Sequence, residues 1–203
     1  ILLLAGLLKP TSGEITYNGK PLHALGWRYR RNCGILFQNP EDQLIASKTY
    51  DDISIGPKQL GIDVESSVLE AARRTGVERI LHKYTHRLSS GQKKRVAIAG
   101  IIAYKPKILL LDEPFAGLDW QGCKMLARII IEHKDQNGII VLTTQDIDIA
   151  LNISDTIILL KNGQLHGTVN PRSEILGPEV FESIGLKPPS ITRIARCMEI
   201  RRE

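Results

Sequence analysis

An apolar run that ends in two adjacent carboxylates is the feature that most constrains the fold of this chain. Residues 107–111 form a near-continuous apolar segment, and Asp112, Glu113 and Pro114 follow it directly. A short run of this kind is typical of a strand in a parallel sheet whose two faces are both covered. Parallel strands require crossover connections, which are usually helices. The run therefore predicts an α/β fold built around a mainly parallel sheet.

The remaining hydrophobic pattern alternates between strands and helices, as that fold class requires. The pairs Asn18-Gly19 and Asn162-Gly163 indicate turns, and Asp63 is a suitable N-cap for a helix that stops at Gly76. A mainly helical insertion between two of the strands suggests a subdomain. The expected elements are the end of a buried helix at 1–8, buried strands at 33–37, Ile139–Thr143 and 155–160, a mainly helical region at 44–104, a helix at 121–133 and a helical stripe at 191–198.

Length and composition exclude several classes of protein. A chain of 203 residues is long enough for one domain with a substantial core. The longest apolar stretch, 1–8, is far shorter than the roughly 20 residues that span a bilayer, and no basic segment marks it as a signal peptide. The cysteines Cys33, Cys123 and Cys197 form no CxxC pair, which favours reduced thiols in the cytosol. The net charge of +5 is spread over local pairs such as Lys93-Lys94, so it indicates a solvated basic surface.

The segment Leu88-Ser89-Ser90-Gly91-Gln92 precedes a helical pattern and predicts an anion site. Ser89 and Gln92 have the spacing of a capping box, in which each side chain bonds the backbone of the other residue. Gly91 allows a ligand to approach the backbone closely. The N-terminus of a helix carries about half a positive charge, which favours a bound phosphate. The alternative is a plain helix cap with nothing bound.

The two carboxylates after the apolar run suit two different tasks. Side chains of neighbouring residues on a strand point to opposite sides, so we expect Asp112 and Glu113 to diverge. Asp112 can hold Mg²⁺ through water, and Glu113 can act as the general base that polarises an attacking water. A solvated strand end is the alternative, but it does not explain the segment that follows, Pro114-Phe115-Ala116-Gly117-Leu118-Asp119.

In this order and spacing, the two motifs resemble the signature and Walker B elements of the ATP-binding-cassette (ABC) ATPases. The resemblance implies a three-layer P-loop NTPase fold with a helical subdomain at about 44–105, a small β-hairpin region, and ATP and Mg²⁺ as ligands. It makes Gln38 the Q-loop glutamine that reaches Mg²⁺ and water, and Asp119 the D-loop residue that bridges two subunits. It also implies that Ser89, Ser90, Gly91 and Gln92 contact the ATP of a partner subunit.

The segment Phe37-Gln38-Asn39-Pro40-Glu41-Asp42-Gln43-Leu44 narrows the resemblance. It is similar to the ATPase component of energy-coupling-factor importers, which take up cobalt, nickel and vitamins. That group implies a second ABC ATPase subunit, identical or different, together with a transmembrane coupling protein and a substrate-binding membrane component, and no nucleic acid. It also implies a peripheral location on the cytoplasmic face of the membrane. A C-terminal extension at about 175–203 is expected to hold the two ATPase subunits together.

Two departures from the family pattern matter. The P-loop, GxxGxGK[ST], is not found within the 203 residues, and the chain does not begin with Met. We therefore expect 1–203 to be a single ABC ATPase domain without its P-loop segment, and this fragment to bind ATP poorly. The position after Val141-Leu142-Thr143-Thr144 is normally the switch histidine that faces the γ-phosphate, and here it is Gln145. An amide can donate a hydrogen bond but cannot carry a proton, so either a tolerated variation or a weakened site follows.

The function expected from these motifs is ATP hydrolysis that drives uptake of a metal ion or vitamin through closure of an ATPase dimer. Glu113, Gln145 and Gln38 are the expected catalytic residues, and Asp112 and Gln38 are the expected metal ligands. One alternative is a weakly hydrolysing or non-hydrolysing scaffold subunit, which Gln145 favours and Glu113 opposes. Another is a soluble ABC ATPase that acts outside transport, although neither a long coiled coil nor a second cassette is present in the sequence.

Overall fold

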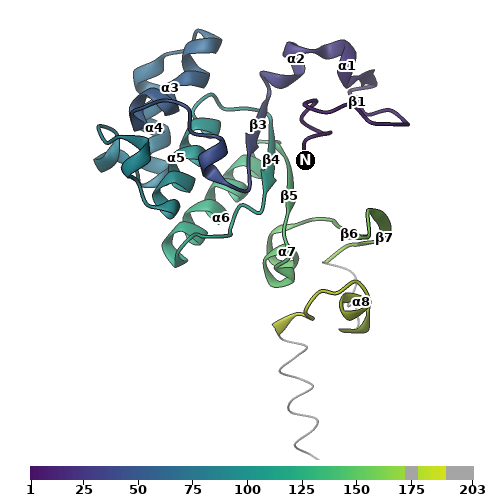
Figure 1. Cartoon of the computed structure of the whole chain (residues 1–203). Coiled ribbons are helices and arrows are strands. Elements are labelled where there is room, and N and C mark those ends of the chain that lie inside the picture. Colours follow the sequence, from purple (N-terminus) through teal and green to yellow (C-terminus); the bar gives the residue numbers. More distant parts are fainter. Residues whose placement is uncertain (172–177, 191–203) are drawn as a thin grey trace, which may run out of the picture. The chain divides into compact units, whose positions relative to one another are not determined.

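The computed structural model describes residues 1–171 and 178–190, and it divides the chain into two compact units. The first unit is Ile1–Thr143 and the second is Thr144–Glu203. Figure 1 shows the elements of both units in chain order. We describe each unit by itself.

A three-stranded parallel sheet lies at the centre of the first unit, which confirms the expected α/β class. Its strands are β3 (Cys33–Leu36), β4 (Ile108–Asp112) and β5 (Ile139–Thr143), in the order β3-β4-β5. The first four residues of β4 are buried, because this strand pairs with a neighbour on each side. The expectation that β5 is buried was wrong: Ile139 and Val141 are 50% and 37% exposed, because these alternate residues lie on a face of β5 that is not covered.

A helical region follows β3, as expected, and returns the chain to β4. In this region α3 (Thr49–Leu60), α4 (Val64–Thr75) and α5 (Ser90–Ile102) pack against one another. The N-cap of α4 is Asp63, whose side chain accepts a hydrogen bond from the Ser66 N–H. Short 3₁₀ turns complete the region: η1 (Pro40–Asp42), η2 (Glu78–Ile80) and η3 (Thr85–Arg87). After β4, helix α6 (Trp120–Asp135) buries Leu126, Ile129 and Ile130, as its 3.6-residue pattern predicts.

The N-terminal segment differs from the expected helix. The Ala5 N–H bonds the Ile1 carbonyl in a single turn, and Gly6 then adopts a φ of +67°. A glycine in this left-handed conformation ends a helical turn, so no helix continues through Leu8. The hairpin at Asn18-Gly19 is confirmed, since both residues have positive φ between the paired strands. The elements of this segment are β1 (Thr16–Tyr17), β2 (Lys20–Pro21), α1 (Leu22–Leu25) and α2 (Trp27–Arg30).

The second unit contains a short helix, an antiparallel hairpin and a further helix. Asn162-Gly163 turns the chain between the hairpin strands, as expected, but the first strand was wrongly assigned as a fully buried one. Ile158 and Leu160 are 63% and 65% exposed, whereas Ile157 and Leu159 are buried, because one face alone packs on the core of this unit. The elements are α7 (Ile147–Ile153), β6 (Ile157–Lys161), β7 (Gln164–Val169) and α8 (Pro178–Ser183).

The expected C-terminal elements lie mostly beyond the residues that the structure describes. The helical stripe at 191–198 lies outside the described residues, as does most of the expected extension at 175–203. Among residues 1–171 and 178–190, no helix combines the length and the apolar character that crossing a bilayer requires.

Candidate functional site

The turn that follows β4 joins both expected carboxylates to the neighbouring strand. The Thr143 hydroxyl, at the end of β5, donates to Oδ1 of Asp112 over 2.5 Å. The same hydroxyl accepts the N–H of Glu113 at 3.1 Å. Asp112 and Glu113 are both half-buried. One hydroxyl on the adjacent strand therefore orients the Asp112 carboxylate and the Glu113 backbone together.

Glu113 does not continue the strand, so strand alternation was the wrong basis for its orientation. Strand β4 ends at Asp112, and Glu113 has a φ of +41°. A glutamate rarely adopts this left-handed conformation, and Pro114 restricts the backbone of Glu113 further. Strain of this kind persists only where the surroundings hold it, and it is common at functional sites.

The capping box at the start of α5 is confirmed. The Gln92 N–H donates to the Ser89 hydroxyl at 3.3 Å, and the Ser89 N–H donates to Oε1 of Gln92 at 3.1 Å. Ser89 and Ser90 are exposed, and Gly91 is half-buried. A Cβ at Gly91 would lie 3.5 Å from the Gly117 carbonyl, which places the start of α5 beside the loop after β4.

Lys94 belongs to this site, and the sequence interpretation missed it. The Lys93-Lys94 pair predicts a solvated surface, but Lys94 is only 2% exposed. Its Nζ donates to the carbonyls of Glu113 at 2.7 Å, Ala116 at 3.0 Å and Gln38 at 3.5 Å. Burial lowers the pKa of Lys94, and the nearby carboxylates of Glu113 and Asp112 oppose that shift. A Lys-Lys pair in a sequence carries no signal that distinguishes the buried lysine from the exposed one.

Asp119, expected to bridge two subunits, caps α6 within this chain. Its Oδ1 accepts the Gly122 N–H at 2.7 Å and pairs with Arg95 at 2.5 Å. The backbone hydrogen bond from Gly122, and then the bond from Arg95, lower the pKa of Asp119. Because Arg95 lies on α5, this pair is a second link between α5 and the loop after β4.

The two glutamines of the expected catalytic set lie in exposed or turn positions. Gln38 follows β3, and its carbonyl is the Lys94 contact described above. Gln145 is exposed and belongs to the second unit, two residues after the end of β5. A third glutamine, Gln43, stabilises the turn after β3: its side chain accepts the Phe37 N–H and donates to the Ile35 carbonyl, each at 3.1 Å.

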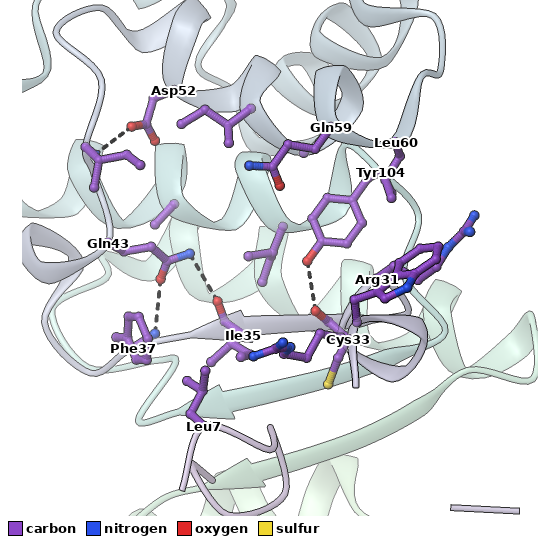
Figure 2. A pocket seen from close by; sticks show the side chains of 18 residues that line it. Leu7, Arg31, Cys33, Ile35, Phe37, Gln43, Asp52, Gln59, Leu60 and Tyr104 are labelled. Atoms are coloured by element: carbon purple, nitrogen blue, oxygen red, sulfur yellow. Dashed lines mark hydrogen bonds between the residues drawn. The ribbon is translucent and has the colours of Figure 1, made fainter. Parts of the chain in front are cut away.

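A cavity of about 560 Å³ lies between strand β3 and helices α3 and α5. Figure 2 shows Tyr104 donating its hydroxyl to the Cys33 carbonyl at 2.9 Å, and Asp52 bonding the segment before α3. Burial raises the pKa of Asp52, and hydrogen bonds from the Ala46 and Ile45 N–H groups oppose that rise. Asp112 and Glu113 do not line this cavity, so it is separate from the acidic turn.

The residues present suit Mg²⁺ bound together with a nucleotide, but not a metal held by protein groups alone. Within the described residues, no cluster of three or more His, Cys, Asp or Glu side chains could hold a metal ion. Mg²⁺ usually keeps several waters and takes one or two carboxylates together with substrate phosphates. The Asp112 carboxylate, with one oxygen bonded by Thr143, retains lone pairs for such a ligand.

Comparison with known proteins agrees with the geometry. A family model described as "ABC transporter" matches residues 1–116. The energy-coupling factor transporter ATP-binding protein EcfA2 of Clostridium perfringens is 38% identical over 205 aligned positions, covering 98% of this chain and 71% of that protein. The corresponding protein EcfA of Methanoculleus marisnigri is 37% identical over 198 positions, covering 95% of this chain and 72% of that protein.

Solved structures give the same result. CbiO1 from Clostridium perfringens, part of the ABC transporter complex CbiONQ, superposes with a TM-score of 0.75 at 36% identity, covering 98% of this chain and 80% of that one. A dimeric ATP-binding cassette in a post-hydrolysis state, bound to ADP and Pi, superposes with a TM-score of 0.77 at 25% identity, covering 85% and 79%. The chain therefore belongs to the ABC transporter family, as an ATPase subunit of the energy-coupling factor type.

Proposed function

We propose that this ATPase subunit powers a membrane importer for a metal ion or a vitamin. Binding of ATP closes a dimer of ATPase subunits, and hydrolysis lets the dimer reopen. The names of the relatives support transport by an energy-coupling factor system, and the dimeric structure with ADP and Pi supports a dimer that hydrolyses ATP. The chain itself contributes an acidic turn that is linked to the start of α5, and this link is the observation that carries the proposal.

The acidic turn divides the chemistry between its two carboxylates. We assign Glu113 as the general base for the attacking water, since its backbone is held at both the N–H and the carbonyl. Asp112 and Gln38 would hold Mg²⁺, which offsets the negative charge of the phosphates when it is bound. Gln145 would donate a hydrogen bond to the γ-phosphate. Positioning and charge stabilisation of this kind account for most of phosphoryl-transfer catalysis.

The start of α5 would serve the second ATP of the dimer. Ser89, Ser90, Gly91 and Gln92 present a capped helix N-terminus, whose dipole favours phosphate. Asp119 lies on the loop beside this helix end and would form the contact between subunits. Each ATP would then lie between the acidic turn of one subunit and α5 of the other.

The cavity between β3 and the helical region is our candidate for contact with the membrane partner. It lies against α3 and α5, and its lining combines apolar side chains with Arg30, Arg31 and Asp52. We propose that a helical subdomain at about 44–105 transmits dimer closure to a transmembrane coupling protein. An extension at about 175–203 would hold the two ATPase subunits together. The subunit would work on the cytoplasmic face of the membrane, together with a separate substrate-binding component.

A non-hydrolysing scaffold subunit is the second candidate, and Gln145 is the observation that favours it. A glutamine at the switch position cannot carry a proton, which in this candidate would weaken one ATP site of the dimer. Glu113 and its two backbone contacts oppose this candidate, since a scaffold has no use for a positioned base.

The decisive test is Glu113→Gln in the complete protein, purified with its partners. The change keeps the shape and removes the base, so we expect hydrolysis to fall by about 10²- to 10⁴-fold while ATP binding is preserved. Glu65→Gln, an exposed position on α4, is the matched control. Phosphate release and binding of a fluorescent ATP analogue measure the two quantities. Full hydrolysis in Glu113→Gln would exclude Glu113 as the base, and no hydrolysis in the unchanged protein would favour the scaffold.

A further inference from the structure

Lys94 is a buried cation whose three donors all bond main-chain carbonyls. The carbonyls belong to Gln38, Glu113 and Ala116, in two segments that are far from α5 in the sequence. A lysine ammonium has three N–H donors, so the group is fully satisfied. Among the described residues, Lys94 is the one lysine or arginine that is buried. It therefore ties α5 to the turn after β3 and to the loop after β4 at a single point.

Burial of this lysine is costly, and packing alone does not explain it. An ammonium removed from water loses solvation, which lowers the pKa of Lys94. A methionine or leucine of similar volume would fill the space without that cost, as it does in many cores where buried charges are replaced. The retained charge points to a requirement for carbonyl ligation at this position.

The backbone of Glu113 provides that requirement. Its φ of +41° lies in the left-handed region, and Pro114 makes a relaxed helical conformation less accessible. Among the residues that the structure describes, five non-glycine residues have positive φ: three are Asn, which tolerates this region, and the others are Lys105 and Glu113. Thr143 holds the N–H of Glu113, and Lys94 holds its carbonyl. Without Lys94, the Thr143 hydroxyl would still hold the N–H of Glu113. The Glu113 carbonyl would keep only the 3.3 Å hydrogen bond from the Ala116 N–H.

We propose that Lys94 is a positioning residue for ATP hydrolysis, which fixes the Glu113 backbone and the Gln38 turn relative to the first turn of α5. The inference rests on the proposed function, in which Glu113 is the general base. Lys94 acts through the main chain of Glu113 and contacts no substrate. The carboxylates of Asp112 and Glu113 lie near enough to its ammonium to favour the charged form.

The test compares Lys94→Met with Lys93→Met in the complete ATPase complex. Lys93 is the neighbouring residue on α5, and it forms an ion pair with Glu41, whose side chain is 64% exposed, so its loss removes the same charge at a smaller energetic cost. We expect Lys94→Met to lower kcat by at least about tenfold relative to Lys93→Met, because small misplacements of a catalytic group cost that much or more. The Kd for a fluorescent ATP analogue should stay within about twofold of the control, since binding does not require the base.

A second variant separates positioning from folding. Lys94→Gln keeps two N–H donors on a shorter chain, and we expect it to recover part of the lost kcat. Thermal unfolding shows whether each variant is folded, and if Lys94→Met does not fold, Lys94→Gln alone carries the comparison. A folded variant with the kcat of Lys93→Met, or a fall in kcat matched by an equal loss of nucleotide binding, would overturn the inference. Glu113→Gln measured in parallel separates the two failures: if that variant is active, the proposed base is wrong, and the inference that rests on it is overturned as well.

Discussion

The hydroxyl of Thr143 donates to Oδ1 of Asp112 over 2.5 Å and accepts the Glu113 N–H at 3.1 Å. These bonds connect the edge strand β5 to the end of the buried strand β4, where the two strands run in parallel and Asp112 pairs with Thr143 in register. Thr143 therefore has two effects on the acidic turn. It orients the Asp112 carboxylate, and it holds the backbone N–H of Glu113.

Replacing Thr143 by valine tests this relationship. Valine keeps the shape and the β-branched side chain, and it removes both hydrogen bonds. We expect kcat for ATP hydrolysis to fall about tenfold, since misplaced catalytic groups are inefficient, and the free energy of unfolding to fall by about 1 kcal/mol. Thr168→Val, on the exposed face of β7, is the control. A Thr143→Val protein with unchanged hydrolysis would show that the hydroxyl does not orient the acidic turn.

Local sequence patterns predicted the elements that depend on neighbouring residues alone. The capping box at Ser89 and the N-cap at Asp63 were correct, because both follow from side chains that bond the backbone three residues away. The apolar strand that ends at Asp112 was also correct, since a short apolar run is typical of a strand covered on both faces, and four consecutive residues of β4 are buried.

Features set by distant partners were missed. Strand β5 is as apolar as β4, but one of its faces is not covered, which leaves Ile139 exposed. The burial of Lys94 depends on carbonyls from two other segments, and the left-handed conformation of Glu113 depends on Thr143 and Lys94. No periodicity in a sequence carries these contacts, because each of them is formed only when the segments have folded together.

Two glycines beside the cavity of Figure 2 should respond to alanine in opposite directions. A Cβ at Gly56 would lie 2.4 Å from Cδ1 of Tyr104, whose hydroxyl is bonded to the Cys33 carbonyl, so the ring cannot move freely. We expect Gly56→Ala to lower the free energy of unfolding by about 1–3 kcal/mol, which exceeds the helix-propensity gain of about 0.5–1 kcal/mol.

Gly100→Ala is the matched change on the facing helix α5. The nearest atom to a Cβ at Gly100 is the Ile53 Cα at 4.0 Å, an ordinary contact. Here the helix-propensity gain should remain, so the free energy of unfolding should rise by about 0.5–1 kcal/mol. Urea unfolding of both variants measures the difference, and stabilisation by both changes would show that Tyr104 accommodates the extra methyl group.

His133 should make the stability of the protein sensitive to acid. Burial lowers the pKa of His133 in the folded protein, and Arg74 lowers it further, while hydrogen bonding to the Lys107 carbonyl opposes the shift. The unfolded chain then binds the proton more readily, with a pKa of about 6.5. The contribution of neutral His133 to the free energy of unfolding is therefore fully present above about pH 6.5, and it is lost as the pH falls below that value.

His133→Gln removes this titration, and its amide can still donate to the Lys107 carbonyl. We expect the Tm of the variant to fall less than that of the unchanged protein between about pH 7.5 and 5.5. His82→Gln, an exposed histidine, is the control and should leave the pH profile unaltered. Parallel Tm profiles for His133→Gln and the unchanged protein would rule out His133 as the source of acid sensitivity.

In the proposed dimer, Gln145 would decide whether the two ATP sites are equal. In the proposed dimer this residue faces the ATP of its own subunit, whereas Ser89, Gly91 and Gln92 serve the ATP of the partner. A partner with a normal switch histidine would then create one strong site and one weak site.

Gln145→His in the complete dimer restores a side chain that can carry a proton, so turnover should rise by up to about tenfold. Gln164→His, an exposed residue on β7, should leave turnover unchanged. Equal rates for Gln145→His and the unchanged protein would mean that glutamine serves this position as well as histidine does, and the weak-site hypothesis would be abandoned.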